Sequence, residues 1–291
     1  MSKEESQEKH EDVLTDNEID VIERNASIRA VAIFEVIRRE GEQELDRPPS
    51  ALALSGLIAG LALGLSVLSE ALFRQYLPDA GWRPLVENLG YSVGFLIVIL
   101  GRMQLFTENT ITAVCPVLDA RKLRFLMRLL RLWAIVLAAN LVGASLFGLI
   151  LHATRGYQPE TWQAVVDLSN HALGFGWMET MLRGIGAGWL IAVLVWTMPN
   201  AEKAKFYVII LITYLIALAD FSHVVAGTVE AAVVVLAGDV SAVDAVTGFV
   251  VPSLIGNLLG GTVFFTLLAW AQIRTELLDE RDLLTAWRDR A

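Results

Sequence analysis

The feature that most limits the folds open to this chain is a series of long apolar stretches. Each is long enough to supply the roughly 20 residues that cross a bilayer core as a helix. With 55% hydrophobic and 19% charged residues, the chain is too apolar for a surface that faces water. The sequence therefore predicts an all-α membrane protein with six transmembrane helices, at about 50–73, 86–118, 130–152, 179–199, 205–236 and 246–272.

The two ends of the chain differ from this apolar region in composition. We predict that residues 1–48 form a cytoplasmic acidic tail, with disorder over 1–17 and an amphipathic surface helix over about 17–42. Residues 49–273 are predicted to be the transmembrane channel domain, and residues 274–291 a charged helical tail in the cytoplasm. The net charge of −9 comes largely from the acidic tail and argues against nucleic acid as a partner. We expect no cleavable signal peptide, because the first residues are polar and acidic.

Positive charges are spread unevenly over the connections between the apolar stretches. The connection after the second stretch contains Arg121, Lys122 and Arg124, and the connection after the fourth contains Lys203 and Lys205. The connections on the other side hold few such charges and several acids. Because basic loops stay on the cytoplasmic side of a membrane, we expect both termini to face the cytoplasm.

Short patterns in the first half of the apolar region recur in the second half. Residues 139–147 (ANLVGASLF) match residues 256–264 (GNLLGGTVF), including one asparagine in each. The first and fourth stretches share a Gly-x-x-Ala-Gly pattern that begins at Gly56 and at Gly184. Small residues alone could recur because helices pack through them, but the paired asparagines favour a true internal repeat.

Each copy of this repeat would contain three membrane spans, over about 50–152 and about 179–272. An odd number of spans forces the second copy into the membrane upside down relative to the first. The sequence therefore predicts two inverted three-helix repeats, whose matching asparagines are Asn140 and Asn257.

The second and fifth stretches carry polar side chains where a plain span would contain leucine and valine. These positions lie around 101–112 and 217–226. Polar groups at such a depth are costly unless they face a cavity or a partner. A helix that breaks there exposes backbone groups that only a pore or the protein interior can satisfy. We therefore predict broken second and fifth helices that line a pore, with Glu108 and His223 at equivalent positions in the two halves.

Four motifs resemble those of the formate/nitrite transporter family. They are Tyr91–Gly94, Leu105–Thr110, Phe221–His223 and Ile255–Gly261. The likeness covers roughly residues 50–272 and is greatest to a divergent branch from the bacterial inner (cytoplasmic) membrane. It implies an aquaporin-like fold in the lipid bilayer, assembled as a homopentamer with a pore in each subunit. It also implies transport of small monovalent anions or their weak acids, such as formate, nitrite or hydrosulfide.

The same resemblance assigns roles to individual residues. It identifies His223 as the central pore histidine, Thr107 as the loop threonine and Asn257 as a pore asparagine. Apolar constrictions are expected on the outer side at Tyr91 and Phe95, and on the inner side at Phe106 and Ile216. Further polar side chains that could face the pore are Glu108, Ser222 and Asn140.

Two positions depart from the family pattern. Gly188 stands where the family has an asparagine in the fourth span. The lysine that the family places in the outer vestibule has no match around residues 171–174. The loss of this lysine puts the attraction of anions to the outer mouth in doubt.

His223 has both a functional and a structural interpretation. An imidazole ordinarily titrates at about pH 6.5, so a histidine in the pore could exchange a proton with a passing anion. The other interpretation is a core histidine whose ring nitrogens are satisfied by Thr107 or by a backbone carbonyl.

Arg102 and Asp220 form a second pair with two interpretations, because both lie within apolar spans. We expect a buried ion pair that holds the two broken segments together, since each charge alone would be costly to bury. The alternative makes Arg102 a ligand for the anion. Glu70 and Glu230 lie near the ends of their stretches and are expected to be interfacial or capping residues.

Other classes of function fit the sequence less well. We expect no enzyme, cofactor or metal site, because the chain shows no catalytic triad, phosphate-binding loop or cluster of metal ligands. A pore for neutral solutes such as water or ammonia is the main alternative, since apolar constrictions also suit uncharged molecules. A membrane scaffold or sensor is a further alternative, in which the charged ends of the chain would bind a soluble partner.

Overall fold

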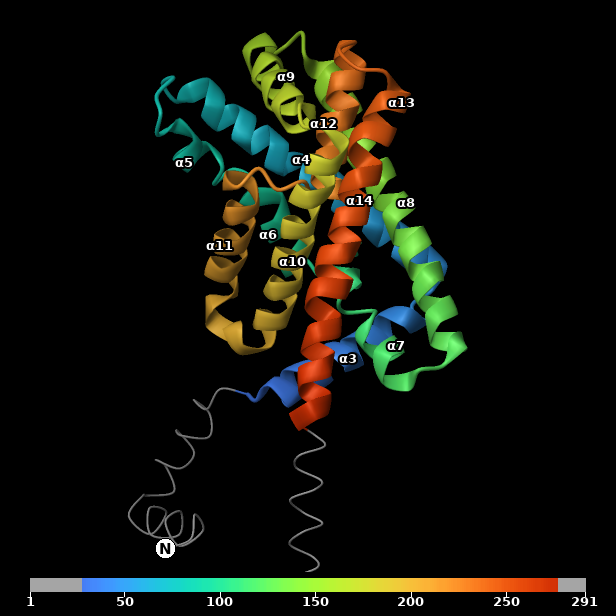
Figure 1. The fold of residues 1–291 in the computed structure, drawn as a ribbon. Coiled ribbons are helices and arrows are strands. Elements are labelled where there is room, and N and C mark those ends of the chain that lie inside the picture. The colour runs from blue at the N-terminus through green and yellow to red at the C-terminus, as the bar shows by residue number, and fades with distance from the viewer. Residues whose placement is uncertain (1–27, 277–291) are drawn as a thin grey trace, which may run out of the picture.

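The structure is a computed structural model that describes residues 28–276. The described residues form helices and contain no strand, as the sequence predicts for an all-α protein (Figure 1). The disorder expected over 1–17, the start of the amphipathic helix and most of the charged tail over 274–291 lie outside the described residues.

The first half of the described chain comprises one amphipathic helix, two long helices and a series of short ones. They are α3 (Ala30–Asp46), α4 (Pro49–Tyr76), α5 (Arg83–Glu87), α6 (Ser92–Leu100), the 3-10 turn η1 (Glu108–Thr110), α7 (Cys115–Ala120) and α8 (Leu123–Thr154).

The second half begins with a helix that links the two halves. Its elements are α9 (Pro159–Leu173), α10 (Trp177–Ala201), the 3-10 turn η2 (Glu202–Ala204), α11 (Lys205–Leu218), α12 (Val224–Ala237), α13 (Ala242–Ala245), the π-helical segments η3 (Val246–Val250) and η4 (Leu259–Leu267), and α14 (Val251–Leu258) between them.

Within residues 28–276, five helical stretches are long and apolar enough to cross a membrane: Pro49–Tyr76, Arg83–Leu100, Leu123–Thr154, Trp177–Leu218 and Ala242–Glu276. The fourth of these is not one straight rod. It reverses direction at Glu202, which has a φ of 23°, so that α10 and α11 lie side by side (Figure 1). The apolar helix α12 follows as a separate, shorter element. The long fifth stretch of the sequence is therefore divided between α11 and α12.

Glycines let the long helices cross at very short range, and they do so in the same way in both halves. A Cβ atom on Gly60 of α4 would lie 2.2 Å from the carbonyl oxygen of Asn140 in α8. A Cβ atom on Gly188 of α10 would lie 2.3 Å from the carbonyl oxygen of Asn257 in α14. Neither crossing can hold a larger residue, which explains why Gly188 cannot be replaced by an asparagine in this packing.

Helix α3 is the described part of the predicted amphipathic helix. It runs from Ala30 to Asp46, so it ends later than expected. Its apolar face buries Ile33, Phe34 and Ile37 in a cluster with Ile111 and Cys115. The helix is therefore packed against the segment that follows α6 and is not a free appendage.

Candidate functional site

Two interruptions in the helices carry the site. After α6 the chain leaves the helix at Gly101, and after α11 it leaves the helix at Ala219. The turn closes identically, because Met103 N–H donates to the Val98 carbonyl at 2.9 Å and Phe221 N–H donates to the Ile216 carbonyl at 2.9 Å. The residue in the middle of each turn, Arg102 or Asp220, has a φ of 51°, the left-handed conformation that often ends a helix.

One buried asparagine holds each interruption in place. Asn140 accepts a hydrogen bond from Phe106 N–H at 2.8 Å and donates to the carbonyls of Gly56 and Gln104 at 2.8 and 2.9 Å. Because the Gln104 carbonyl and the Phe106 N–H lie outside regular helix, they need such partners to be buried. Both N–H donors of Asn140 are used on the backbone, so its amide supports the interruption.

Asn257 does the same for the second interruption. It accepts from Val224 N–H at 2.9 Å and donates to the carbonyls of Gly184 and Ser222 at 2.9 and 2.8 Å. The two expected pore asparagines thus have their donors directed at the protein backbone. Gly56 and Gly184, which begin the shared pattern in the sequence, accept from equivalent asparagines.

These hydrogen bonds correct the expected register between the halves. Met103 corresponds to Phe221 and Gln104 to Ser222, so the residue that corresponds to His223 is Leu105 and not Glu108. The prediction from the sequence aligned Phe106-Thr107 with Phe221-Ser222. This alignment displaced the register between the halves by three positions. The equivalent positions therefore hold an apolar residue in the first half and a histidine in the second.

His223 is fixed on both ring nitrogens at the start of α12. Its Nδ1 accepts a hydrogen bond from Ala226 N–H at 3.2 Å, which caps the helix. An Nδ1 that accepts must carry no proton, so in the neutral ring Nε2–H donates to the Thr107 hydroxyl oxygen, 2.8 Å away. The structure thus brings together Thr107 and His223, both of which are less than 3% exposed.

The apolar residues expected at the constrictions separate into two groups. Phe95 contacts the His223 ring edge-on at 5.1 Å between centroids, and Tyr91 lies against Phe95 at the same distance. Phe106 packs against Trp133 of α8, 5.9 Å between centroids, while Ile216 is fully buried. The aromatic pair of α6 therefore touches the histidine directly, whereas Phe106 packs sideways into the helical scaffold.

Two cavities approach this centre. The first, of about 450 Å³, reaches Tyr91, Ser222 and His223. The second, of about 390 Å³, reaches Leu105 and Glu108. The two interruptions thus each line one cavity, and the Thr107–His223 hydrogen bond connects the two interruptions.

The expected buried ion pair between Arg102 and Asp220 is wrong. Arg102 lines the second cavity with its side chain 75% exposed, and its ion pair is with Glu40 of α3 at 3.5 Å. Asp220 lines the first cavity with its side chain 45% exposed, 3.0 Å from His171 Nε2. The two residues occupy equivalent positions in the two halves. Each lies at the interruption of its own half, and the two interruptions line different cavities.

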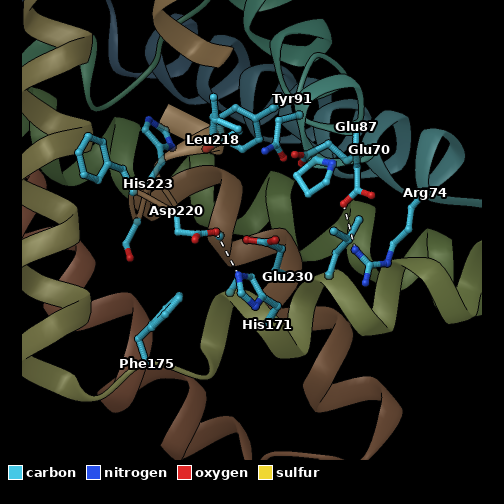
Figure 2. A pocket seen from close by; sticks show the side chains of 18 of the residues that line it. Glu70, Arg74, Glu87, Tyr91, His171, Phe175, Leu218, Asp220, His223 and Glu230 are labelled. Atoms are coloured by element: carbon cyan, nitrogen blue, oxygen red, sulfur yellow. Dashed lines mark hydrogen bonds and ion pairs between the residues drawn. The ribbon is translucent and has the colours of Figure 1, made fainter. Parts of the chain in front are cut away.

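The sequence analysis missed charged residues of the first cavity (Figure 2). Glu70 and Glu230, expected near span ends, both line this cavity, and Glu70 is only 7% exposed. His171 lines it too, in the region where no match to the family's vestibule lysine was found. The helical spacing of Glu70 and Arg74, one turn apart on α4, was the available signal for a charged helix face.

A family model described as formate/nitrite transporter matches residues 31–271. The chain belongs to the formate/nitrite transporter family. It is therefore a helical membrane transport protein of a channel and transporter class, as the resemblance in its motifs predicted.

Individual members of the formate/nitrite transporter family are similar over most of this chain. The inner membrane protein YfdC of Escherichia coli is 41% identical over 263 residues, which are 90% of this chain and 85% of YfdC. A probable formate transporter of Methanothermobacter thermautotrophicus is 25% identical, over 75% of this chain and 83% of its own length.

Solved structures of the family share the fold. A pentameric formate channel with formate bound superposes with a TM-score of 0.65 at 21% identity, over 77% of this chain and 96% of that one. An FNT family ion channel superposes with a TM-score of 0.69 at 18% identity, over 84% of this chain and 98% of that one.

Proposed function

We propose that this protein carries small monovalent anions or their weak acids across the bacterial inner membrane, through a pore in each subunit of a homopentamer. Formate, nitrite and hydrosulfide are the solute type. The observation that carries the proposal is the buried Thr107–His223 contact, 2.8 Å long, which joins two interrupted helices that each line a cavity. The names of the similar proteins, a formate transporter and a pentameric formate channel, support this solute class and assembly.

The architecture that fits this function has six crossings in two inverted halves, with an aquaporin-like arrangement and both termini in the cytoplasm. Helices α6 and α7 would make the broken second crossing, and α11 and α12 the broken fifth. The matched hydrogen bonds of Asn140 and Asn257 support the inverted repeat, because they join equivalent backbone groups in both halves. The inner membrane localisation of YfdC supports the same membrane.

The local chemistry suggests how a solute and a proton interact at the centre. Because His223 Nε2–H donates to the Thr107 oxygen, the hydroxyl proton of Thr107 is left to donate to a solute. A second proton on His223 Nδ1 would face the Ala226 N–H and break the helix cap. Proton exchange at His223 would therefore be coupled to loosening of the first turn of α12.

The test compares wild-type protein with His223→Asn in proteoliposomes loaded for flux of labelled formate, nitrite and acetate. We expect flux through the wild type to vary between pH 5 and pH 8, and we expect His223→Asn to lose that variation because an amide cannot titrate in this range. The control is His152→Asn, which changes a histidine of α8 that packs against Trp162 away from the site. An unchanged pH profile in His223→Asn would reduce His223 to a packing and capping residue.

A pore for neutral solutes is the second candidate. Phe95 and Ile216, the residues expected at the outer and inner constrictions, are fully buried, and such apolar side chains favour uncharged molecules. Stopped-flow measurement of water and ammonia permeation in the same proteoliposomes separates the two functions. Rapid ammonia or water permeation with no flux of the three anions would replace the proposed function by this one.

A further inference from the structure

The first cavity, next to His223, has an unusual balance of charge. Its arginines are already engaged by carboxylates. Arg74 donates to Glu87 Oε1 at 3.0 Å, and Arg83 lies 3.3 Å from the other oxygen of Glu87 and 3.2 Å from Asp79. The charges of these two arginines are therefore balanced by Glu87 of α5 and by Asp79, which precedes α5.

The other charges in and beside the cavity are also paired. His171 of α9 lies 3.0 Å from Asp220. Arg183 of α10, which neighbours the cavity, is bonded to Glu179 at 2.9 Å, lies 3.8 Å from Asp220 and covers the ring of Phe175. His223 uses both ring nitrogens on Thr107 and Ala226, so no basic side chain that lines the cavity within residues 28–276 is left to balance a further carboxylate.

Two carboxylates on the cavity wall have no such compensation. Glu70 comes from α4 and Glu230 from α12, and Figure 2 shows both among the lining side chains. Neither makes a side-chain hydrogen bond or ion pair with another residue in the described part of the chain. Glu70 is nonetheless 93% buried, and burying a carboxylate without a partner is strongly unfavourable. The arrangement therefore needs compensation from outside the chain, either bound protons or a positively charged ligand.

We propose that this cavity binds a small monovalent cation of the ammonium class, held by the carboxylates of Glu70 and Glu230. The described residues contain no group of three or more metal-ligating side chains, so a tightly coordinated divalent metal does not fit. Aromatic rings line the same cavity at Tyr91, Phe221 and Phe249. The faces of such rings attract ammonium and alkylammonium ions, and this attraction adds to that of the carboxylates.

The proposal does not depend on which solute the pore carries. It concerns equilibrium binding in a cavity and can be measured with no flux at all. A bound cation would also place a positive charge at the mouth that lacks the family's lysine, so it would suit the entry of an anion.

The experiment measures equilibrium binding of [14C]methylammonium to the full-length protein in detergent by dialysis, with ammonium chloride, sodium chloride and tetramethylammonium chloride as competitors. We expect saturable binding that ammonium displaces better than sodium does. In Glu70→Gln and in Glu230→Gln we expect the affinity to fall at least about tenfold, and in the double variant we expect no measurable binding. Size-exclusion profiles identify any variant that does not fold, in which case the remaining single variant decides.

The control is Glu160→Gln, which removes one exposed, unpaired carboxylate from α9 outside the cavity. It should bind methylammonium as the wild type does. Absence of binding in the wild type would overturn the proposal and leave protons as the compensation for Glu70 and Glu230. Equal loss in Glu160→Gln would reduce the effect to general surface charge, and displacement by sodium as strong as by ammonium would exclude the ammonium class.

Discussion

The two interrupted helices share a backbone and differ in chemistry. Both turn at a residue with a φ of 51°, and both are held by an asparagine that bonds three backbone groups. The second resumes at once as α12, a helix of 14 residues that His223 caps. The first passes through a short 3-10 turn and does not form a helix again until Cys115. The equivalent of His223 there is Leu105, so only one half brings a titratable group to the centre.

Different neighbours also brace the two interruptions. Helix α3 supports the first, because Glu44 accepts from the Gln104 amide at 2.7 Å and Gly41 lies against the backbone at Thr112. Helix α9 supports the second through the His171–Asp220 contact. The first brace includes a close backbone contact at Gly41, whereas the brace from α9 is a half-exposed ionic contact. The two interruptions thus have the same backbone conformation but are held by different side-chain contacts. The effect of each set of contacts on stability can be measured.

The largest expected effects come from the asparagines. Asn140→Ala and Asn257→Ala each leave two backbone groups of an interruption without a partner inside the protein, so each should lower the free energy of unfolding by about 3–5 kcal/mol. Thermal unfolding in detergent measures the loss. The control is Asn200→Ala, because Asn200 bonds only the exposed backbone of Ile28 and should cost less than about 1 kcal/mol. If one of the two buried variants were as stable as the control, the interruptions would not be structurally equivalent.

The next effect distinguishes the two braces. A Cβ atom on Gly41 would lie 1.9 Å from the Thr112 carbonyl oxygen, so Gly41→Ala must separate α3 from the first interruption, at a cost of about 1–3 kcal/mol. Hydrogen exchange should rise over residues 104–115 and stay unchanged over 219–224. Gly81→Ala is the matched control, since nothing lies within 4 Å of its Cβ position. Equal increases in exchange at both interruptions would show that one brace serves the whole molecule.

The smallest effect tests whether Arg102 and Asp220 interact at all. Each has an exposed partner of its own, so Arg102→Gln and Asp220→Asn should each cost less than about 1 kcal/mol. In the double variant the losses should add within about 0.5 kcal/mol, because the two residues line different cavities. A double-mutant cycle by thermal unfolding gives the coupling. A coupling well above that value would restore the ion pair across the centre and contradict the equivalence of the two turns.

The comparison of the halves shows where sequence reasoning succeeds. The pairing of Asn140 with Asn257, and of Gly56 with Gly184, could be read from short motifs, because close helix crossings and buried interruptions admit very few residue types. Polar groups in two of the apolar stretches predicted breaks near 101–112 and 217–226, and α6 and α11 end at Leu100 and Leu218. The register within the interruptions was predicted wrongly. Phe–hydroxyl pairs occur in both halves, and irregular backbone has no periodicity that could fix the alignment.

The sequence by itself therefore determined the helical membrane class, the family and the positions of the two interruptions, because hydrophobic length and small-residue packing are local properties of the chain. Only the tertiary structure decided which side chains meet. It placed Arg102 and Asp220 in separate cavities and brought Glu70 and Glu230 into the same one. Such contacts depend on how helices far apart in the sequence cross. A span of known composition can present any of its faces to the centre, and packing against the other helices selects the one it presents.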